Sequence, residues 1–350
     1  MKLLIIQQKM IGDVLTSTIL FEALRKHFPE AQLDYLVETN TLAVIENNPY
    51  IDNSIILSPN IRQNKILFWR FLNQIRSENY TIVIDVYSVT TSALTTFFSA
   101  AKQRISYRKW YTKCLYTNTV LRSKIPSFNI SLARENRLKL LQPLGINPDT
   151  TLFPKIYLTE IEKNNARKLL EQFEISKTNP LYMISVLGSN NSKTYPTHFM
   201  ANVLDFICET QPNAQLLFNY IPSQITEAKN IFNLCKPQTK NCIYFNLYGK
   251  TLREFLALTW CCDAMIGNEG GAINMAKALN TPTFTIFSPY IIKKNWFGAV
   301  ESKIHSAVHL NDYETYDLKA AKKNSGYYYN RFKPELFLES LSEFLNKIKI

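Results

Sequence analysis

Residues 181–196 read Leu-Tyr-Met-Ile-Ser-Val-Leu-Gly-Ser-Asn-Asn-Ser-Lys-Thr-Tyr-Pro, an apolar run followed by a polar loop with one glycine. The apolar run has the length of a buried strand, and the loop is typical of a turn from a strand into a helix, here from about Pro196. The order of strand, turn and helix recurs along the chain. It predicts an α/β fold built from parallel βαβ units.

The first half of the chain repeats this pattern. An apolar strand at 3–6 precedes a helix from about Asp13 to His27, and Pro29 marks its end. A second helix is expected over 67–75 from its apolar spacing. Further strands are expected at 33–37 and 81–85.

The second half follows the same plan. Thr159 and Glu162 form a capping box that predicts a helix over 160–173. At 350 residues the chain exceeds what one core usually supports, so we expect two domains, 1–165 and 166–350, with the last helix free to pack back on the first domain. Four more strands are expected, at 215–219, 243–246, 264–267 and 283–287.

Composition narrows the class of protein. Hydrophobic residues make up 46% and charged residues 19%, which describes a globular chain with sizeable cores and excludes a disordered one. The apolar run near the N-terminus is too short for a signal peptide, and no stretch approaches ~18 apolar residues, so we expect a cytoplasmic protein without a membrane span. The six cysteines show no CxxC pair or zinc spacing and are expected to be free thiols.

The net charge of +12 calls for an anionic partner, and the basic residues are unevenly distributed. No acidic residue lies between Asp85 and Glu135, where basic and aromatic side chains alternate. This segment is either a solvated basic face or a surface that meets anionic lipid headgroups or a phosphorylated glycolipid. Nucleic acid would use the same residue types, but no nucleic-acid-binding motif is present. The residues are Lys102, Arg104, Arg108, Lys109, Lys113, Arg122, Lys124 and Arg134, with Tyr107, Trp110, Tyr111 and Tyr116 among them.

Glycine is scarce, with nine in the chain, and four glycines mark strand-to-helix turns: Gly12, Gly188, Gly270 and Gly271. In parallel sheets ligands bind at the carboxyl ends of strands, where helix N-termini offer N–H groups to phosphates. The motifs of dinucleotide oxidoreductases, P-loop NTPases, zinc proteases and serine hydrolases are absent, and so is the DxD of metal-dependent sugar transferases. The sequence therefore suggests phosphate binding without a divalent ion.

Several ordered fragments resemble glycosyltransferase family 9, the bacterial heptosyltransferases. The likeness covers nearly the whole chain and depends on the order and spacing of the fragments. They are Met10-Ile-Gly-Asp13, Tyr80-Thr-Ile-Val-Ile-Asp85, the Leu138 to Gly145 helix end, Lys193-Thr-Tyr-Pro196, Asn246-Leu-Tyr-Gly-Lys250-Thr, Cys262-Asp-Ala-Met-Ile-Gly-Asn-Glu-Gly-Gly271, Ala276-Lys-Ala-Leu279 and Pro282-Thr-Phe-Thr-Ile-Phe-Ser-Pro289.

The resemblance implies a GT-B enzyme, in which two Rossmann-like domains face each other across a cleft. The N-terminal domain would receive a lipopolysaccharide-core or related glycolipid acceptor. The C-terminal domain would bind a nucleotide-diphosphate sugar, ADP-heptose in most of the family, as a co-substrate. Transfer would invert the anomeric carbon, with no cofactor, metal or nucleic acid involved. The enzyme would associate peripherally with the inner face of the cytoplasmic membrane.

The resemblance also assigns residues. Asp13 would be the general base, although its alternative role is a plain helix N-cap. Lys193 would contact the donor phosphates, or it is a solvated loop lysine, and the glycines at 270 and 271 bind donor or only permit a turn. The donor set is Ser189, Lys193, Asn268, Glu269, Gly270, Gly271 and Asn274. The acceptor set is Gly12, Arg104, Arg108, Lys109 and Lys113.

The chain also departs from the family pattern. Glu269-Gly270-Gly271 and then Asn274 stand where the family has Asp-Ser/Thr-Gly and a His, and Tyr195 replaces a Trp. The region 222–224 lacks an acidic residue often found there. Two alternative functions are a GT-B sugar-nucleotide epimerase or hydrolase, and a non-catalytic basic binding protein.

Overall fold

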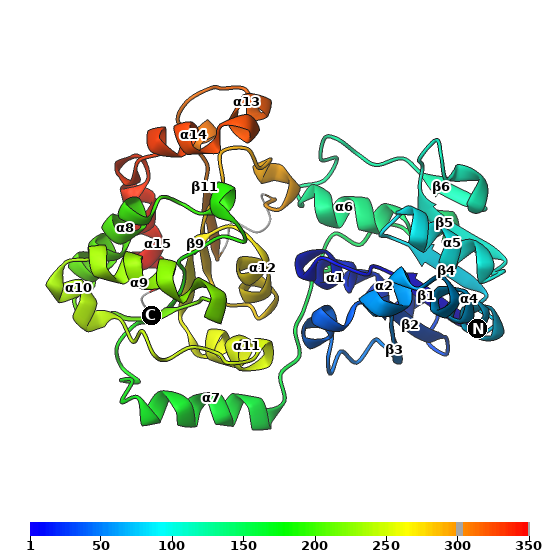
Figure 1. Cartoon of the computed structure of the whole chain (residues 1–350), viewed down its shortest axis with the longest axis horizontal. Helices are drawn as coiled ribbons and strands as arrows, with labels where there is room; N and C mark the ends of the chain where they lie inside the picture. Colours follow the sequence, from blue (N-terminus) through cyan, green and yellow to red (C-terminus); the bar gives the residue numbers. More distant parts are fainter. Residues whose placement is uncertain (299–303, 349–350) are drawn as a thin grey trace. The chain divides into compact units, whose positions relative to one another are not determined.

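The computed structural model of the protein describes residues 1–298 and 304–348. The chain forms two compact units (Figure 1). The first comprises Met1–Tyr157 and residues 294–298, and the second comprises residues 158–293 and 304–348. Each unit is an α/β fold around one parallel sheet, as the alternation of strands and helices predicts. The boundary at 165 expected from the sequence would cut a helix that belongs to the second unit.

The sheet of the first unit has six strands in the order β3-β2-β1-β4-β5-β6, all parallel. β1 and β4 are its central strands, so the loops that follow them lie side by side at the carboxyl edge. The strands are β1 (Lys2–Ile6), β2 (Gln32–Val37), β3 (Asn53–Ile56), β4 (Ile82–Asp85), β5 (Gln103–Tyr107) and β6 (Asn118–Val120).

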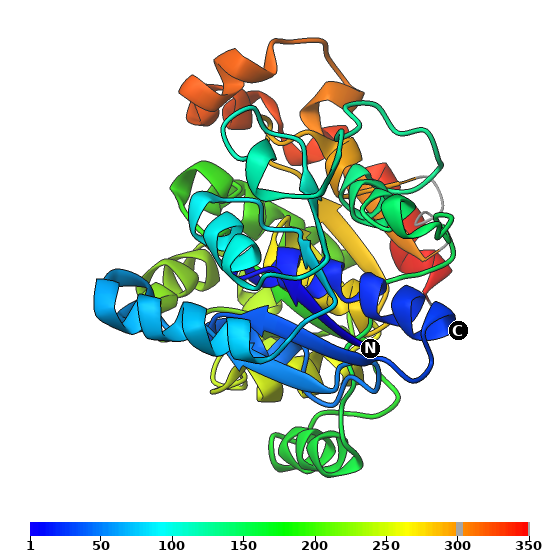
Figure 2. The same ribbon diagram turned by 90° about the vertical axis from the view of Figure 1, so that its right-hand side faces the viewer.

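Helices cover both faces of this sheet (Figure 2). Because successive strand residues face opposite sides, Leu4 packs against Phe71 and Ile75 of α4 on one face. On the other face Tyr35 packs against Phe21 of α2, with ring centroids 4.7 Å apart. The helices are α1 (Ile11–Ser17), α2 (Ile19–His27), α3 (Pro59–Gln63), α4 (Lys65–Ser77), α5 (Thr90–Phe98) and α6 (Leu132–Lys139).

The sheet of the second unit has five parallel strands in the order β11-β10-β9-β7-β8. β7 and β9 are neighbours, so the loop after β7 and the turn after β9 lie at the same edge. The strands are β7 (Leu181–Ser185), β8 (Gln215–Phe218), β9 (Ala264–Asn268), β10 (Thr283–Ile286) and β11 (His305–Val308).

The last helix packs inside the second unit. Phe344 of this helix lies 5.6 Å, centroid to centroid, from Phe284 of β10, and Leu341 and Leu345 are fully buried beside it. The helices are α7 (Glu160–Gln172), α8 (Thr197–Thr210), α9 (Ile225–Leu234), α10 (Pro237–Cys242), α11 (Leu252–Cys261), α12 (Gly271–Ala278), α13 (Leu318–Lys323), α14 (Ser325–Arg331) and α15 (Leu338–Lys347).

Two local predictions were wrong. Residues 243–246 form no strand, because only Ile243 makes a bridge, to Leu216, before the chain turns. The single helix expected over 13–27 is two helices that meet at Thr18, whose hydroxyl donates to the carbonyl of Leu15 at 2.7 Å. No helix within the described ranges has both the length and the apolarity to cross a bilayer.

Candidate active site

Asp13 lies in the first turn of α1, directly after the central strand β1. The helix begins at Ile11, and Met10 is its N-cap residue without a side-chain hydrogen bond. Asp13 therefore does not cap the helix, which removes the structural role that the sequence left open. Its carboxylate remains 35% exposed.

Arg137 of α6 holds the Asp13 carboxylate. Its Nη2 donates to Asp13 Oδ1 at 2.8 Å and to the Asp13 carbonyl at 3.1 Å, while its Nε donates to Ser17 Oγ at 2.8 Å. The guanidinium is only 7% exposed and is fixed further by the carbonyl of Ala133. This fork geometry orients the carboxylate and leaves Oδ2 available as a proton acceptor. Arg137 could not be identified from the sequence, because it lies 124 residues from Asp13.

The eight basic residues between Asp85 and Glu135 fall into three groups. Arg104 donates to the carbonyls of Leu115 and Ala101, and Lys109 donates to the carbonyl of Ser88, so both brace the backbone. Arg134 is buried and donates to the carbonyl of Leu152. The remaining five are solvent-exposed: Lys102, Arg108, Lys113, Arg122 and Lys124.

Large apolar side chains are exposed among these cations. Trp110 is 86% exposed, and the backbone N–H of Arg108 beside it donates to the carbonyl of Val120 at 2.8 Å. That bond brings the loop after β5 next to the segment after β6, which carries more exposed apolar residues. The set consists of Trp110, Tyr111, Leu121, Ile125 and Phe128. Cations interspersed with exposed apolar and aromatic residues are typical of a surface that meets a lipid interface.

The loop 188–194 of the second unit, which we name the donor loop, is closely tied together. Gly188 has no room for a side chain, because a Cβ there would lie 2.3 Å from the carbonyl oxygen of Lys193. Thr194 Oγ1 accepts from the N–H of Gly188, and Asn190 accepts from the N–H of Lys193. Ser288 Oγ donates to the carbonyl of Ser192 from the turn after β10. Ser189 is exposed and lines the groove that borders this loop.

Lys193 and Glu269 meet at the carboxyl edge of the second sheet. Lys193 Nζ lies 3.4 Å from Glu269 Oε1, and the Glu269 side chain is 8% exposed. Burial raises the pKa of Glu269 above its ordinary value, while Lys193 opposes that shift. The pair therefore places one cation and one acid, both held by neighbouring strands, where a donor ligand is expected.

The turn from β9 into α12 has an open face. Gly270 has φ +153°, a conformation that favours glycine, and nothing lies within 4 Å of a Cβ built at Gly270 or Gly271. Asn274 is half-buried in the first turn of α12. Asn268 differs, because its amide accepts from the N–H of Tyr195 at 2.6 Å and donates to the carbonyl of Ser185 at 2.8 Å. Its side chain joins the donor loop to the sheet.

A groove of about 380 Å³ borders the donor loop on its other side. Gln224 closes one wall by donating to the carbonyl of Gly188 at 3.1 Å, and Glu227 of α9 lines the same wall. The sequence lacks an acid at 222–224, and Glu227, three residues after Gln224, is an acid that lines this groove. Helical periodicity was the signal that could have identified it.

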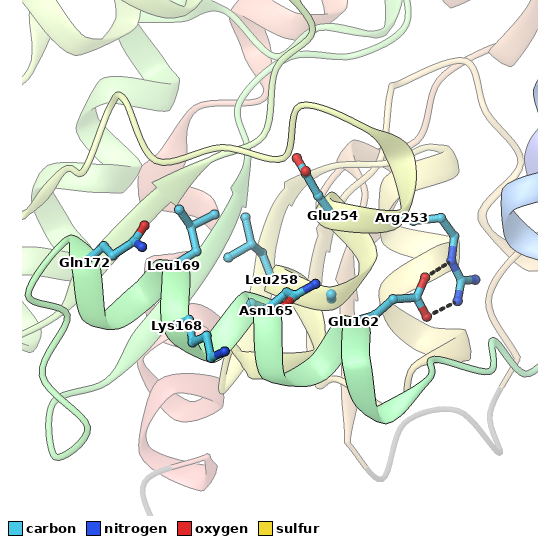
Figure 3. A pocket seen from close by; sticks show the side chains of 10 residues that line it. Glu162, Asn165, Lys168, Leu169, Gln172, Arg253, Glu254 and Leu258 are labelled. Carbon is cyan, nitrogen blue, oxygen red and sulfur yellow. Dashed lines mark hydrogen bonds and ion pairs between the residues drawn. The ribbon is translucent and has the colours of Figure 1, made fainter.

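A second pocket, of about 410 Å³, lies between α7 and α11 (Figure 3). Arg253 closes one end by a paired contact with Glu162, Nε to Oε1 at 2.6 Å and Nη2 to Oε2 at 2.7 Å. The pocket contains none of the catalytic, donor or acceptor residues predicted from the sequence. Glu162 also forms the capping box of α7 with Thr159, so this pair joins two helices of the second unit.

Comparison with known proteins identifies the family. The profile of glycosyltransferase family 9 (heptosyltransferase) matches residues 68–327. The chain belongs to this family. Lipopolysaccharide heptosyltransferase 1 of Campylobacter coli is 22% identical over 87% of this chain and 89% of its own length. Lipooligosaccharide heptosyltransferase 2 of Haemophilus influenzae is 23% identical over 99% and 100%.

The fold comparison agrees. The structure of Escherichia coli ADP-heptose lipopolysaccharide heptosyltransferase II superposes with a TM-score of 0.76 at 18% identity, covering 100% of both chains. An E. coli heptosyltransferase solved with ADP gives a TM-score of 0.64 at 16% identity, over 92% of this chain and 96% of that one. The chain therefore has the GT-B fold expected from the sequence, and this family 9 protein is a glycosyltransferase.

Proposed function

We propose that this family 9 enzyme transfers heptose from ADP-heptose to a lipopolysaccharide-core or related anionic glycolipid acceptor, with inversion and without a metal ion. The donor in this proposal comes from the names of its relatives. The observation that carries the proposed chemistry is Asp13, a part-exposed carboxylate with one oxygen held by Arg137 and the other available.

The proposed base suits an inverting transfer. Such a reaction needs a carboxylate that removes the acceptor hydroxyl's proton as the hydroxyl attacks the anomeric carbon. Arg137 orients Asp13 through Oδ1 and through its backbone carbonyl, so rotation of the carboxylate is restricted. Pre-orientation of this kind lowers the entropy cost of reaching the reactive geometry.

The donor side needs positive charge and backbone N–H groups for a departing diphosphate. Lys193 provides the cation, and the open turn at Gly270 and Gly271 provides backbone without side-chain obstruction. Donor phosphate would compete with Glu269 for Lys193. No group of three or more His, Cys, Asp or Glu able to hold a metal is found within the described residues. In this proposal no metal is needed, because the Lys193 cation offsets the charge of the departing diphosphate.

The groove lined by Gln224 and Glu227 is the proposed site of the nucleoside. It adjoins the donor loop, and its acid can accept hydrogen bonds from ribose hydroxyls. The acceptor is assigned to the first unit, where exposed Arg108 and Lys113 supply charge for an anionic core. The apolar residues beside them are proposed to contact the membrane that carries the acceptor.

A ligand screen followed by a transfer assay tests this function. ADP-, GDP-, UDP- and CDP-sugars are compared by thermal shift with and without EDTA, since a ligand that binds the native state raises its melting temperature. We expect ADP-heptose to stabilise the protein most and EDTA to have no effect. Mass spectrometry should then show a heptosylated glycolipid. Release of free sugar without acceptor, or loss of donor binding in EDTA, would contradict the proposal.

A further inference from the structure

Asp85 is a fully buried carboxylate at the carboxyl end of the central strand β4. Its Oδ1 accepts from the N–H of Ser88 at 2.7 Å, and its Oδ2 accepts from the hydroxyl of Tyr116 at 2.7 Å. A buried charge is costly unless it is paired, and an apolar residue at such a place is often as stable. A fully buried carboxylate with two hydrogen-bond donors at this position is therefore a candidate for a role beyond packing.

Both partners of Asp85 lead to the basic-aromatic loop, which we define as residues 108–117. Tyr116 belongs to this loop and is 7% exposed, so its ring is inserted while the preceding residues face solvent. Lys109, from the other end of the loop, donates to the carbonyl of Ser88, whose N–H is bound to Asp85. The two ends of the loop, at Lys109 and Tyr116, are thus fixed at one buried point, while Trp110 and Lys113 lie exposed between them.

We propose that Asp85 is a positioning residue that anchors the basic-aromatic loop at both ends and thereby sets binding of the anionic glycolipid acceptor. This inference rests on the proposed function. Asp85 would not touch the acceptor, because it is fully buried. It acts through its hydrogen bonds with Tyr116 and Ser88, and the carbonyl of Ser88 accepts a hydrogen bond from Lys109.

The electrostatics of the anchor support this role. Burial raises the pKa of Asp85 to about 6, against the lowering effects of the Ser88 N–H and the Tyr116 hydroxyl. Burial and then the charge of Asp85 raise the pKa of Tyr116, so Tyr116 remains a hydrogen-bond donor at neutral pH. The titratable groups that face Asp85 are Lys109, Tyr116 and Tyr107.

The chain offers a matched control. Tyr80 precedes β4 and donates from its hydroxyl to the buried carboxylate of Asp34 at 2.7 Å. This is the same type of bond in the same unit, at the amino end of β4 rather than its carboxyl end. Phenylalanine at either tyrosine keeps the ring and removes only the hydroxyl.

The test compares Tyr116→Phe, Tyr80→Phe and Asp85→Ala in glycolipid transfer assays. Loss of a hydrogen bond to a charged group should raise the acceptor KM of Tyr116→Phe by about tenfold, with donor KM and kcat unchanged. Tyr80→Phe should lower the melting temperature comparably but leave the acceptor KM unchanged. Adding Tyr116→Phe to Asp85→Ala should have no further effect, because both remove one interaction.

Amide hydrogen exchange gives a second readout that does not need activity. Tyr116→Phe should speed exchange within 108–117, and Tyr80→Phe should not. An unchanged acceptor KM and unchanged loop exchange in Tyr116→Phe would overturn the inference, as would an equal rise of KM in both tyrosine variants. If the wild-type protein transfers no sugar, the proposed function fails, while the exchange experiment still decides whether Asp85 anchors the loop.

Discussion

Replacing Asp13 by Asn separates the proposed base from a structural residue. Asn keeps an oxygen that can accept from Arg137 Nη2, and Met10 rather than Asp13 is the N-cap residue of α1. The change removes the negative charge of a pair whose carboxylate side chain is 35% exposed. Arg137 is largely buried but keeps its bonds to Ser17 and to the carbonyl of Asp13, so we expect a stability loss of about 1 kcal/mol.

The kinetic effect should be much larger. Removal of a positioned general base lowers kcat by roughly 10²–10⁴, which is about 2.7–5.4 kcal/mol of transition-state stabilisation. Donor affinity should stay the same, because the donor is assigned to the second unit. Arg137→Lys keeps the charge but loses the fork that binds Asp13 and Ser17 together, so its kcat should fall as well, though less.

The assay is steady-state transfer to the glycolipid, with melting curves and donor titrations on the same preparations. Asp149→Asn is the control, since its carboxylate has a similar exposure, 36%, and pairs with Lys26 at 3.2 Å in the same unit. It should leave kcat unchanged. The proposed role of Asp13 as the base is refuted if Asp13→Asn lowers stability as much as Asp149→Asn does and, like that control, leaves kcat unchanged. If Asp13→Asn loses donor binding instead, the carboxylate acts on the nucleotide sugar and the base must be sought elsewhere, with Glu269 the next candidate.

Three further predictions concern other sites. Lys193→Gln should weaken donor binding about tenfold in calorimetry through loss of a charge-assisted contact, whereas Lys177→Gln, at a lysine whose side chain is 80% exposed in the same unit, should not. Arg108→Glu with Lys113→Glu should reduce sedimentation with anionic glycolipid vesicles in a salt-dependent way, and equal binding would make this surface a solvated face. Arg253 lowers the pKa of Glu162 from 4.5 to about 2, so this pair stabilises the fold above pH 4.5 and loses its effect as pH falls toward 2. The advantage of wild type over Glu162→Gln in urea unfolding should therefore vanish across that interval, and a difference independent of pH would exclude this role.

The local sequence pattern was sufficient to predict the strands and turns that position the candidate site. The apolar runs at 3–6 and 181–187 and the scarce glycines after them led to Asp13 and to the donor loop. The pattern failed at 243–246, where Ile-Tyr-Phe-Asn has the composition of a strand but follows the short helix α10. There Phe245 stacks on Tyr220, with ring centroids 5.2 Å apart, and the chain turns before a second pairing can form.

Pairing between distant residues could not be predicted in the same way. Arg137 lies on a helix with ordinary charged neighbours, and nothing in its local sequence indicates that it binds Asp13. The basic segment shows the same limit, because exposed Arg108 and braced Arg104 have the same composition around them. Arg104 braces the backbone because the fold brings the carbonyl of Leu115 within hydrogen-bond distance of its side chain.

The parallel order of both sheets has a consequence for how the chain folds. β1 pairs with β2 and also with β4, which lies about 80 residues further along the chain. β7 and β9 pair across a similar sequence separation. Pairing between strands so far apart in the sequence slows folding. Before these pairs form, the apolar strands have unpaired edges that associate with other chains. Recovery of active enzyme from denaturant should therefore fall steeply with protein concentration, and slow synthesis at low temperature should favour its production.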